Sequence, residues 1–199
     1  MQPFKIIDDV ISKDYQDYLE QLLLDSNDLP WFLIRNLNEI KSNQQNTHTA
    51  GLSIQSISDG KDHGMLALIF RSLTYSLAEK LDISINEIIN ARTFLQLPGG
   101  NLSETIVREY HVDYAKPHKV LLYYVNDSDG DTIVLKQKYP FSHNRISGLT
   151  QGEVLQQISP KKGRVIMFDG SHFHSSTVPS KQLRCVINID VTLSSYENS

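Results

Sequence analysis

Hydrophobic residues in the first part of the chain recur at helical spacing in two places. After Ser12, which can cap a helix, one apolar side comprises Tyr15, Tyr18, Leu19, Leu22 and Leu23. A second repeat runs from about Asp62 to Leu81, with an apolar side of Leu66, Ile69, Phe70, Leu73, Leu77 and Leu81. The pattern predicts two helices, with short strands at 4–7, 31–36 and 51–57.

After residue 88 the pattern changes to short β-like runs separated by turn residues. The runs cover 88–97, 105–113, 119–126, 131–135, 153–158, 164–169 and 183–193, with turns at 98–100, 127–131 and 160–163. Helices followed by many short strands indicate an α+β chain whose β part is a sandwich or barrel.

The last predicted strand has two different faces. One face carries Cys185, Ile187, Ile189 and Val191, and the other carries Arg184, Val186, Asn188 and Asp190. We expect the apolar face to pack against helices and the polar face to line a cavity.

Composition narrows the class of protein. The 199 residues carry a net charge of −4, and the pI of about 5.9 gives no sign of a nucleic-acid-binding surface. Cys185 is the only cysteine, so an internal disulfide or a cysteine zinc cluster is impossible. We find no secretory signal and no apolar run of membrane-spanning length, and we expect a cytoplasmic protein.

Two histidines and one aspartate form a candidate metal site. His111 and Asp113 are two positions apart on a predicted strand, so both side chains can face one ion. His174 follows a distant strand and completes two histidines and one carboxylate, a ligand set typical of non-haem Fe(II) oxygenases. Arg184 lies ten positions later and can bind a carboxylate through two parallel hydrogen bonds.

Each residue also has a simpler interpretation. A His-x-Asp tripeptide is common by chance, and Arg184 could pair with a surface acid. His172 competes with His174, because alternation places both on one face, although the spacing to Arg184 favours His174. Surface or turn positions are favoured for the other histidines, which are His48, His63, His118 and His143; the alternatives are a site role for His118 and a substrate contact for His143.

The sequence resembles a known family in two segments, HVDYAKPHKVLLYYVNDSDGDTIVL (111–135) and PKKGRVIMFDGSHFHSSTVPSKQLRCVINIDV (160–191). It looks like the 2-oxoglutarate/Fe(II) dioxygenases of the prolyl-hydroxylase-like group, especially short versions encoded by cyanobacterial phages. The resemblance implies a double-stranded β-helix (jelly-roll) over 89–194, with helical support and first strands in 1–88 and a single domain over 1–199.

The same resemblance implies roles for individual residues. His111, Asp113 and His174 would hold Fe(II), and Arg184 would bind the distal carboxylate of 2-oxoglutarate. Tyr124 would hydrogen-bond that carboxylate, and Thr132 would lie near it; the family's Gly-Gly-acid turn is here Gly130-Asp131-Thr132. Tyr123 and Tyr124 could instead both be core aromatics.

The expected activity is hydroxylation that uses Fe(II), 2-oxoglutarate and O2. The resemblance points to a prolyl or other side chain of a protein or peptide as substrate; a small molecule stays open, and the oligomeric state is not predicted. Loops 37–50 and 136–158 are long enough to act as lids. The alternatives are a non-catalytic cupin-like metal-binding barrel, or a phage structural jelly-roll that binds neither iron nor co-substrate.

Overall fold

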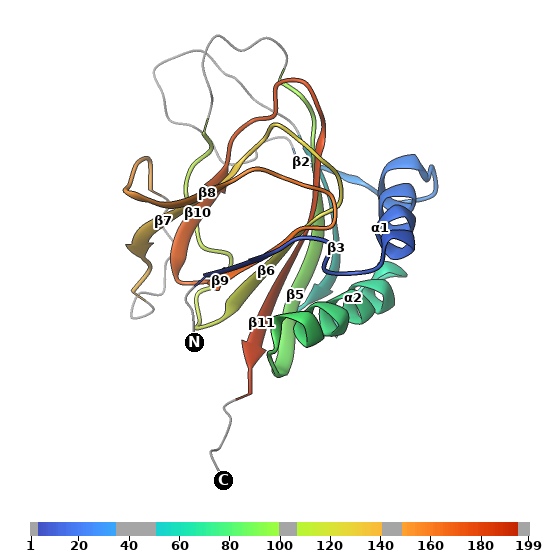
Figure 1. The fold of residues 1–199 in the computed structure, drawn as a ribbon, viewed down its shortest axis with the longest axis horizontal. Helices are drawn as coiled ribbons and strands as arrows, with labels where there is room; N and C mark the ends of the chain where they lie inside the picture. The colour runs from blue at the N-terminus through green and yellow to red at the C-terminus, as the bar shows by residue number, and fades with distance from the viewer. Residues whose placement is uncertain (1–3, 35–50, 100–106, 141–148, 195–199) are drawn as a thin grey trace.

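A computed structural model describes residues 4–34, 51–99, 107–140 and 149–194 of the chain. They form two antiparallel β-sheets and two α-helices, arranged with both helices on one side of the larger sheet (Figure 1). Within the described part, no helix is both long and apolar enough to cross a membrane.

The larger sheet has eight strands in an order that mixes early and late segments of the chain. That order is β1 (Phe4–Ile7), β9 (Val165–Asp169), β6 (Lys119–Tyr124), β11 (Arg184–Leu193), β5 (Ile85–Gln96), β3 (Gly51–Ser58) and β2 (Phe32–Ile34), with β4 (Lys61–Asp62) paired to β3. The smaller sheet has the order β10 (His172–Ser176), β7 (Thr132–Lys138) and β8 (Val154–Ile158). Strands from before residue 88 therefore extend the sheet that holds the later strands.

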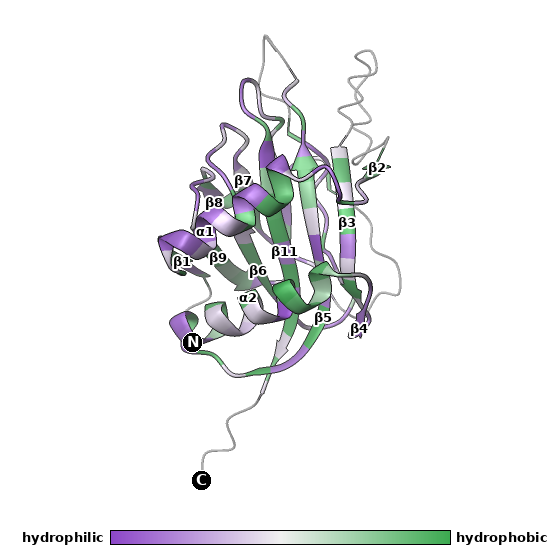
Figure 2. Ribbon diagram, turned by 90° about the vertical axis from the view of Figure 1, so that its right-hand side faces the viewer, coloured by the Kyte–Doolittle hydropathy of each residue, from purple (hydrophilic) through white to green (hydrophobic). Residues whose placement is uncertain are grey.

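The helices cover the apolar face of the larger sheet. α1 (Lys13–Glu20) begins after Ser12, whose side chain accepts a hydrogen bond from the Tyr15 N–H, and a π-helical turn (Gln21–Asp25) follows it. α2 (Leu66–Leu81) packs its apolar side into the same core. Figure 2 shows hydrophobic stretches of β6 and β11 behind the two helices. The predicted apolar face of β11 is confirmed, since Cys185, Ile187, Ile189 and Val191 belong to this core.

Most predicted elements are found, with four corrections. The second helix begins at Leu66 rather than near Asp62, because Lys61–Asp62 pairs with β3. The predicted strand at 105–113 is wrong for its described part, since residues 107–113 form only isolated bridges. β10 was not predicted as a strand. The loop expected over 136–158 is too long: β7 extends to Lys138, and β8 confirms the strand that is also predicted at 153–158.

Three expectations fall outside the described residues, wholly or in part. The expected lid at 37–50 and the side chains of His48 and His143 lie entirely outside them, and the turn at 98–100 lies there in part.

Candidate metal centre

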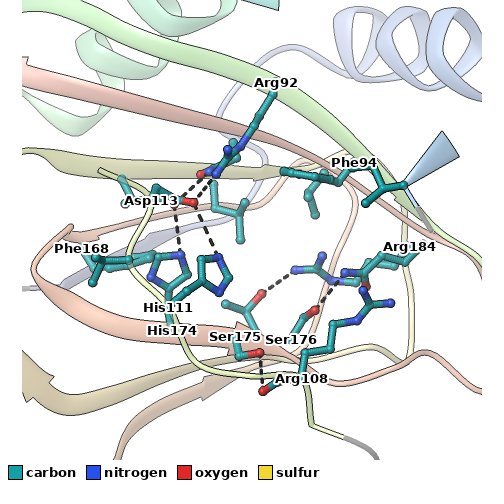
Figure 3. A pocket seen from close by; sticks show the side chains of 18 residues that line it. Arg92, Phe94, Arg108, His111, Asp113, Phe168, His174, Ser175, Ser176 and Arg184 are labelled. Atoms are coloured by element: carbon teal, nitrogen blue, oxygen red, sulfur yellow. Dashed lines mark hydrogen bonds and ion pairs between the residues drawn. The ribbon is translucent and has the colours of Figure 1, made fainter. Parts of the chain in front are cut away.

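The two sheets enclose a cavity of about 340 Å³. Its walls include inward-facing residues of β5 and β11 from the larger sheet and of β7 and β10 from the smaller one (Figure 3). The predicted polar face of β11 lines it through Arg184 and Asn188. Apolar side chains form much of the remaining wall, namely Phe94, Val120, Leu122, Phe168 and Val186. Such a mixture of apolar walls and a few polar groups is typical of a ligand site.

His111, Asp113 and His174 meet at one wall of this cavity. One ligand atom from each residue can be chosen so that all three lie within 4.8 Å of one another. The Nε2 atom of His174 is 3.1 Å from Asp113 Oδ2, and the Nε2 atom of His111 is 3.7 Å from Asp113 Oδ1. The predicted ligand set is therefore brought together from the segment before β6 and from β10.

The backbone sets the tautomer of both imidazoles. His111 Nδ1 lies 3.3 Å from the carbonyl oxygen of Glu109, and His174 Nδ1 lies 3.2 Å from that of His172. A carbonyl oxygen only accepts, so each Nδ1 must carry the proton. A bound cation would take the place of any proton on the Nε2 atoms that face Asp113 and would use their lone pairs, which is how metal-binding histidines are commonly held. The donor set thus fits a divalent transition metal such as Fe(II).

Asp113 is a buried carboxylate with several polar partners. Arg92 on β5 forms an ion pair with Oδ1, and the Asn188 amide on β11 donates to Oδ2 across 3.0 Å. Burial by itself would raise the pKa of Asp113, but the charge of Arg92 and the contacts with His174 and His111 hold that pKa well below its usual value. Asp113 is therefore ionised, as a metal ligand must be.

The structure separates His174 from its competitor His172. A shift of register lies between the two residues in the pairing of β10 with β7. His172 Nδ1 contacts the Leu135 carbonyl oxygen at 2.7 Å, and His172 does not belong to the group around Asp113. The bulge therefore overrides the simple alternation that places both histidines on one face.

The other described histidines do not join the group. His118 is fully buried, and its Nδ1 lies 2.7 Å from the Lys116 carbonyl oxygen, while burial lowers its pKa. His63 is exposed.

Arg184, Tyr124 and Thr132 form a second buried cluster, which reaches the cavity through Arg184 and Thr132. Arg184 Nη2 and the Tyr124 hydroxyl each donate to Thr132 Oγ1 across 2.7 Å. The Arg184 guanidinium also lies over the Tyr124 ring, 5.7 Å from its centroid. A Cβ at Gly130 would lie 3.1 Å from Arg184 Cδ, so the glycine leaves room for the arginine stem. Thr132 accepts two hydrogen bonds, which leaves its own hydroxyl proton free to be donated.

Tyr123 and Tyr124 differ although both are buried. Tyr123 belongs to the core beneath the helices, whereas Tyr124 points to the other side of β6 and bonds Thr132. The alternation of a strand explains this difference between neighbouring residues.

Two cavity residues, Arg92 and Arg108, are absent from the predicted site. Both line the cavity, and Arg108 is 5% exposed. Each is a cation inside a run with strand-like hydrophobicity, a signal that could have found them.

Comparisons with known proteins place the fold but not a family. No family model matches the sequence, and no curated protein matches it. A 2OG-Fe(II) oxygenase family protein from Burkholderia pseudomallei superposes with a TM-score of 0.62 at 13% sequence identity. The superposition covers 96% of this chain and 85% of that chain.

Two prolyl hydroxylases are similar at the same level. For a Pseudomonas putida prolyl-4-hydroxylase the TM-score is 0.56 at 11% identity, with 95% of this chain and 91% of that chain covered. A Trichoplax adhaerens prolyl hydroxylase, bound to a peptide of hypoxia inducible factor, has a TM-score of 0.56 at 16% identity. The match covers 96% of this chain and 84% of that chain. The chain therefore has the jelly-roll fold of 2-oxoglutarate oxygenases, with two helices.

Proposed function

We propose that this chain is a non-haem Fe(II) oxygenase that couples the oxidative decarboxylation of 2-oxoglutarate to the hydroxylation of a substrate. The observation that carries the proposal is the convergence of three donor groups: one ligand atom from each of His111, Asp113 and His174 lies within 4.8 Å of the others, in a cavity that also holds a buried arginine. The likeness to 2-oxoglutarate oxygenases supports it at the level of the fold.

In this proposal each residue has a defined task. His111, Asp113 and His174 hold the iron, and Arg184 pairs with the distal carboxylate of 2-oxoglutarate. The Thr132 hydroxyl donates to the same carboxylate, since its lone pairs already accept from Arg184 and Tyr124. Tyr124 fixes that hydroxyl, and the three side chains are ordered before the co-substrate arrives.

The iron and its co-substrates supply the oxidation itself: 2-oxoglutarate and O2 give succinate and carbon dioxide, and one oxygen atom enters the substrate. The protein's residues orient the co-substrate and exclude water. Phe168 and Val186 are apolar lining residues on the side of the larger sheet. They would keep water away from the reacting groups and so limit side reactions with solvent.

For the substrate, we favour a prolyl or other side chain of a protein or peptide. The support is the peptide bound by the Trichoplax adhaerens relative. A small-molecule substrate is the competing class, and the cavity volume of about 340 Å³ accommodates the co-substrate and a small reacting group in either case.

Fe(II)-dependent release of succinate from 2-oxoglutarate tests the proposal. Purified protein with Fe(II), ascorbate and O2 should form succinate slowly without substrate and faster with a peptide library that contains proline. His174→Ala and Asp113→Ala should abolish succinate formation, whereas His172→Ala, the matched control on the same strand, should retain it. A folded protein that binds metal but never forms succinate would favour the cupin-like alternative.

A further inference from the structure

Arg108 is held in place by the strand that carries His174. Its backbone N–H donates to the Ser176 carbonyl oxygen across 3.2 Å, and its own carbonyl oxygen accepts from the Ser175 hydroxyl across 2.9 Å. Both contacts fix the chain immediately before His111, although no regular strand forms there. The Arg108 side chain is consequently directed into the cavity from a fixed point.

Arg108 and Arg184 lie in the same part of that cavity (Figure 3). Their exposed fractions are 5% and 4%, so both guanidiniums are removed from water. Burial and then the charge of Arg184 lower the pKa of Arg108 to about 10, and Arg108 is still a cation at neutral pH. Two buried like charges repel, which is electrostatically unfavourable. An anion bound between the two guanidiniums would offset this repulsion.

Arg184 retains capacity for such an anion. Its Nη2 donates to Thr132, but its Nε atom is buried and has no hydrogen-bond partner within the described ranges. The cavity-lining residues that the structure describes include three guanidiniums and one carboxylate, and that carboxylate, Asp113, pairs with Arg92. Among the described lining residues, the charges near Arg184 are therefore positive.

We propose that Arg108 is a second ligand for the distal carboxylate of 2-oxoglutarate, acting together with Arg184, and that it makes the site selective for dicarboxylic 2-oxo acids. The inference rests on the proposed function. A carboxylate has two oxygens that accept about four hydrogen bonds, enough for two guanidiniums and the Thr132 hydroxyl. The competing assignment is that Arg108 binds an anionic group of the substrate.

A pair of ligands separates these assignments by direct binding, without turnover. 2-Oxoglutarate is compared with 2-oxopentanoate, which has the same carbon chain and the same metal-binding end but no distal carboxylate. Affinities are measured by isothermal titration calorimetry on protein loaded with Zn(II), for wild type, Arg108→Gln and Arg108→Lys. Arg71→Gln is the matched control, since it removes one guanidinium from α2, outside the cavity.

Arg108→Gln should weaken 2-oxoglutarate binding by about tenfold to a hundredfold, the range for a lost charged hydrogen bond, and should change 2-oxopentanoate binding less than about twofold. Arg108→Lys should give an intermediate loss, because it keeps the charge without the planar pair of donors. Arg71→Gln should match wild type for both ligands.

Two results would overturn the inference. An equal loss for both ligands would mean that Arg108 acts on the shape of the site, and an unchanged affinity for 2-oxoglutarate would assign Arg108 to another group, such as the substrate. If wild type itself fails to bind 2-oxoglutarate, the proposed function fails and takes this inference with it. Circular dichroism verifies folding, and Arg108→Lys supplies the same ligand comparison if Arg108→Gln does not fold.

Discussion

Asn188 donates from its side-chain amide to Oδ2 of Asp113 across 3.0 Å. Strand β11 therefore orients the carboxylate of the candidate metal site. The same strand carries Arg184 four residues earlier, on the same face. One rigid element thereby sets both ends of the cavity: the carboxylate that would face the ion and the guanidinium that would face the co-substrate. The central position of β11 between β5 and β6 fixes this spacing.

Removing the Asn188 amide should therefore weaken metal binding. We expect Asn188→Ala to lower metal affinity by about tenfold to a hundredfold, the usual effect of losing a group that orients a ligand. Competition titration with Co(II) against a chromophoric chelator measures it. Asn86→Ala is the control, since it removes an exposed amide of β5 that bonds Thr192 at the far end of the same sheet. Equal affinities for Asn188→Ala and wild type would show that Asp113 needs no such support.

Thr132→Val should destabilise the fold and impair the co-substrate site together. Valine keeps the shape of threonine but leaves the Tyr124 hydroxyl and an Arg184 N–H buried without their acceptor. Each unsatisfied buried donor costs about 1–3 kcal/mol, so urea denaturation should give a loss of at least that size.

The control for this substitution is Thr192→Val at the partly exposed end of β11, for which we expect a change within about 0.5 kcal/mol. A loss for Thr132→Val no larger than that of the control would mean that Thr132 does not connect Arg184 and Tyr124 in solution.

Lowering the pH should remove the contribution that Asp129, in the turn at 127–131, makes to the stability of the fold. Asp129 accepts hydrogen bonds from the Ser180 hydroxyl and from the backbone N–H groups of residues 180–182, just before β11. Burial alone would raise the pKa of Asp129, but these hydrogen bonds outweigh it and lower the pKa to about 2. A pKa lower in the folded than in the unfolded state stabilises the fold above the unfolded value of 3.8, and that stabilisation is lost as the pH falls towards about 2.

Asp129→Asn should thus be less stable than wild type near neutral pH, and the difference should shrink as the pH falls from about 4 towards about 2. Urea denaturation at a series of pH values measures the difference, with Asp25→Asn as an exposed control. A difference that stays constant across this window would exclude a titrating Asp129 as the source.

Much of the β architecture could be predicted from the sequence because its strands alternate or form short apolar runs between turn residues. The two faces of β11 are one example, since Cys185, Ile187, Ile189 and Val191 are in the core and Arg184 and Asn188 are in the cavity. The convergence of His111, Asp113 and His174 was predictable as well, because two histidines and an aspartate near strand ends are a specific combination.

Other features depend on contacts that no local pattern encodes. The segment 107–113 looks like a strand, yet its backbone forms only isolated bridges to residues 149, 174 and 177 and a hydrogen bond from Arg108 to Ser176, rather than a continuous ladder. His172 and His174 could not be separated by alternation, because the bulge between them comes from the pairing of β10 with β7. Arg92 and Arg108 acquire their significance only where the two sheets face each other.

Anaerobic titration of Fe(II) into the protein with 2-oxoglutarate, followed by visible absorption, tests the central claim most directly. Wild type should develop the weak charge-transfer band of 2-oxoglutarate chelated to Fe(II), saturating at one iron per chain, while Asp113→Ala and His111→Ala should show none. Absence of the band in folded wild-type protein at saturating concentrations of both, or its persistence in Asp113→Ala, would contradict the assignment of these residues to an iron site.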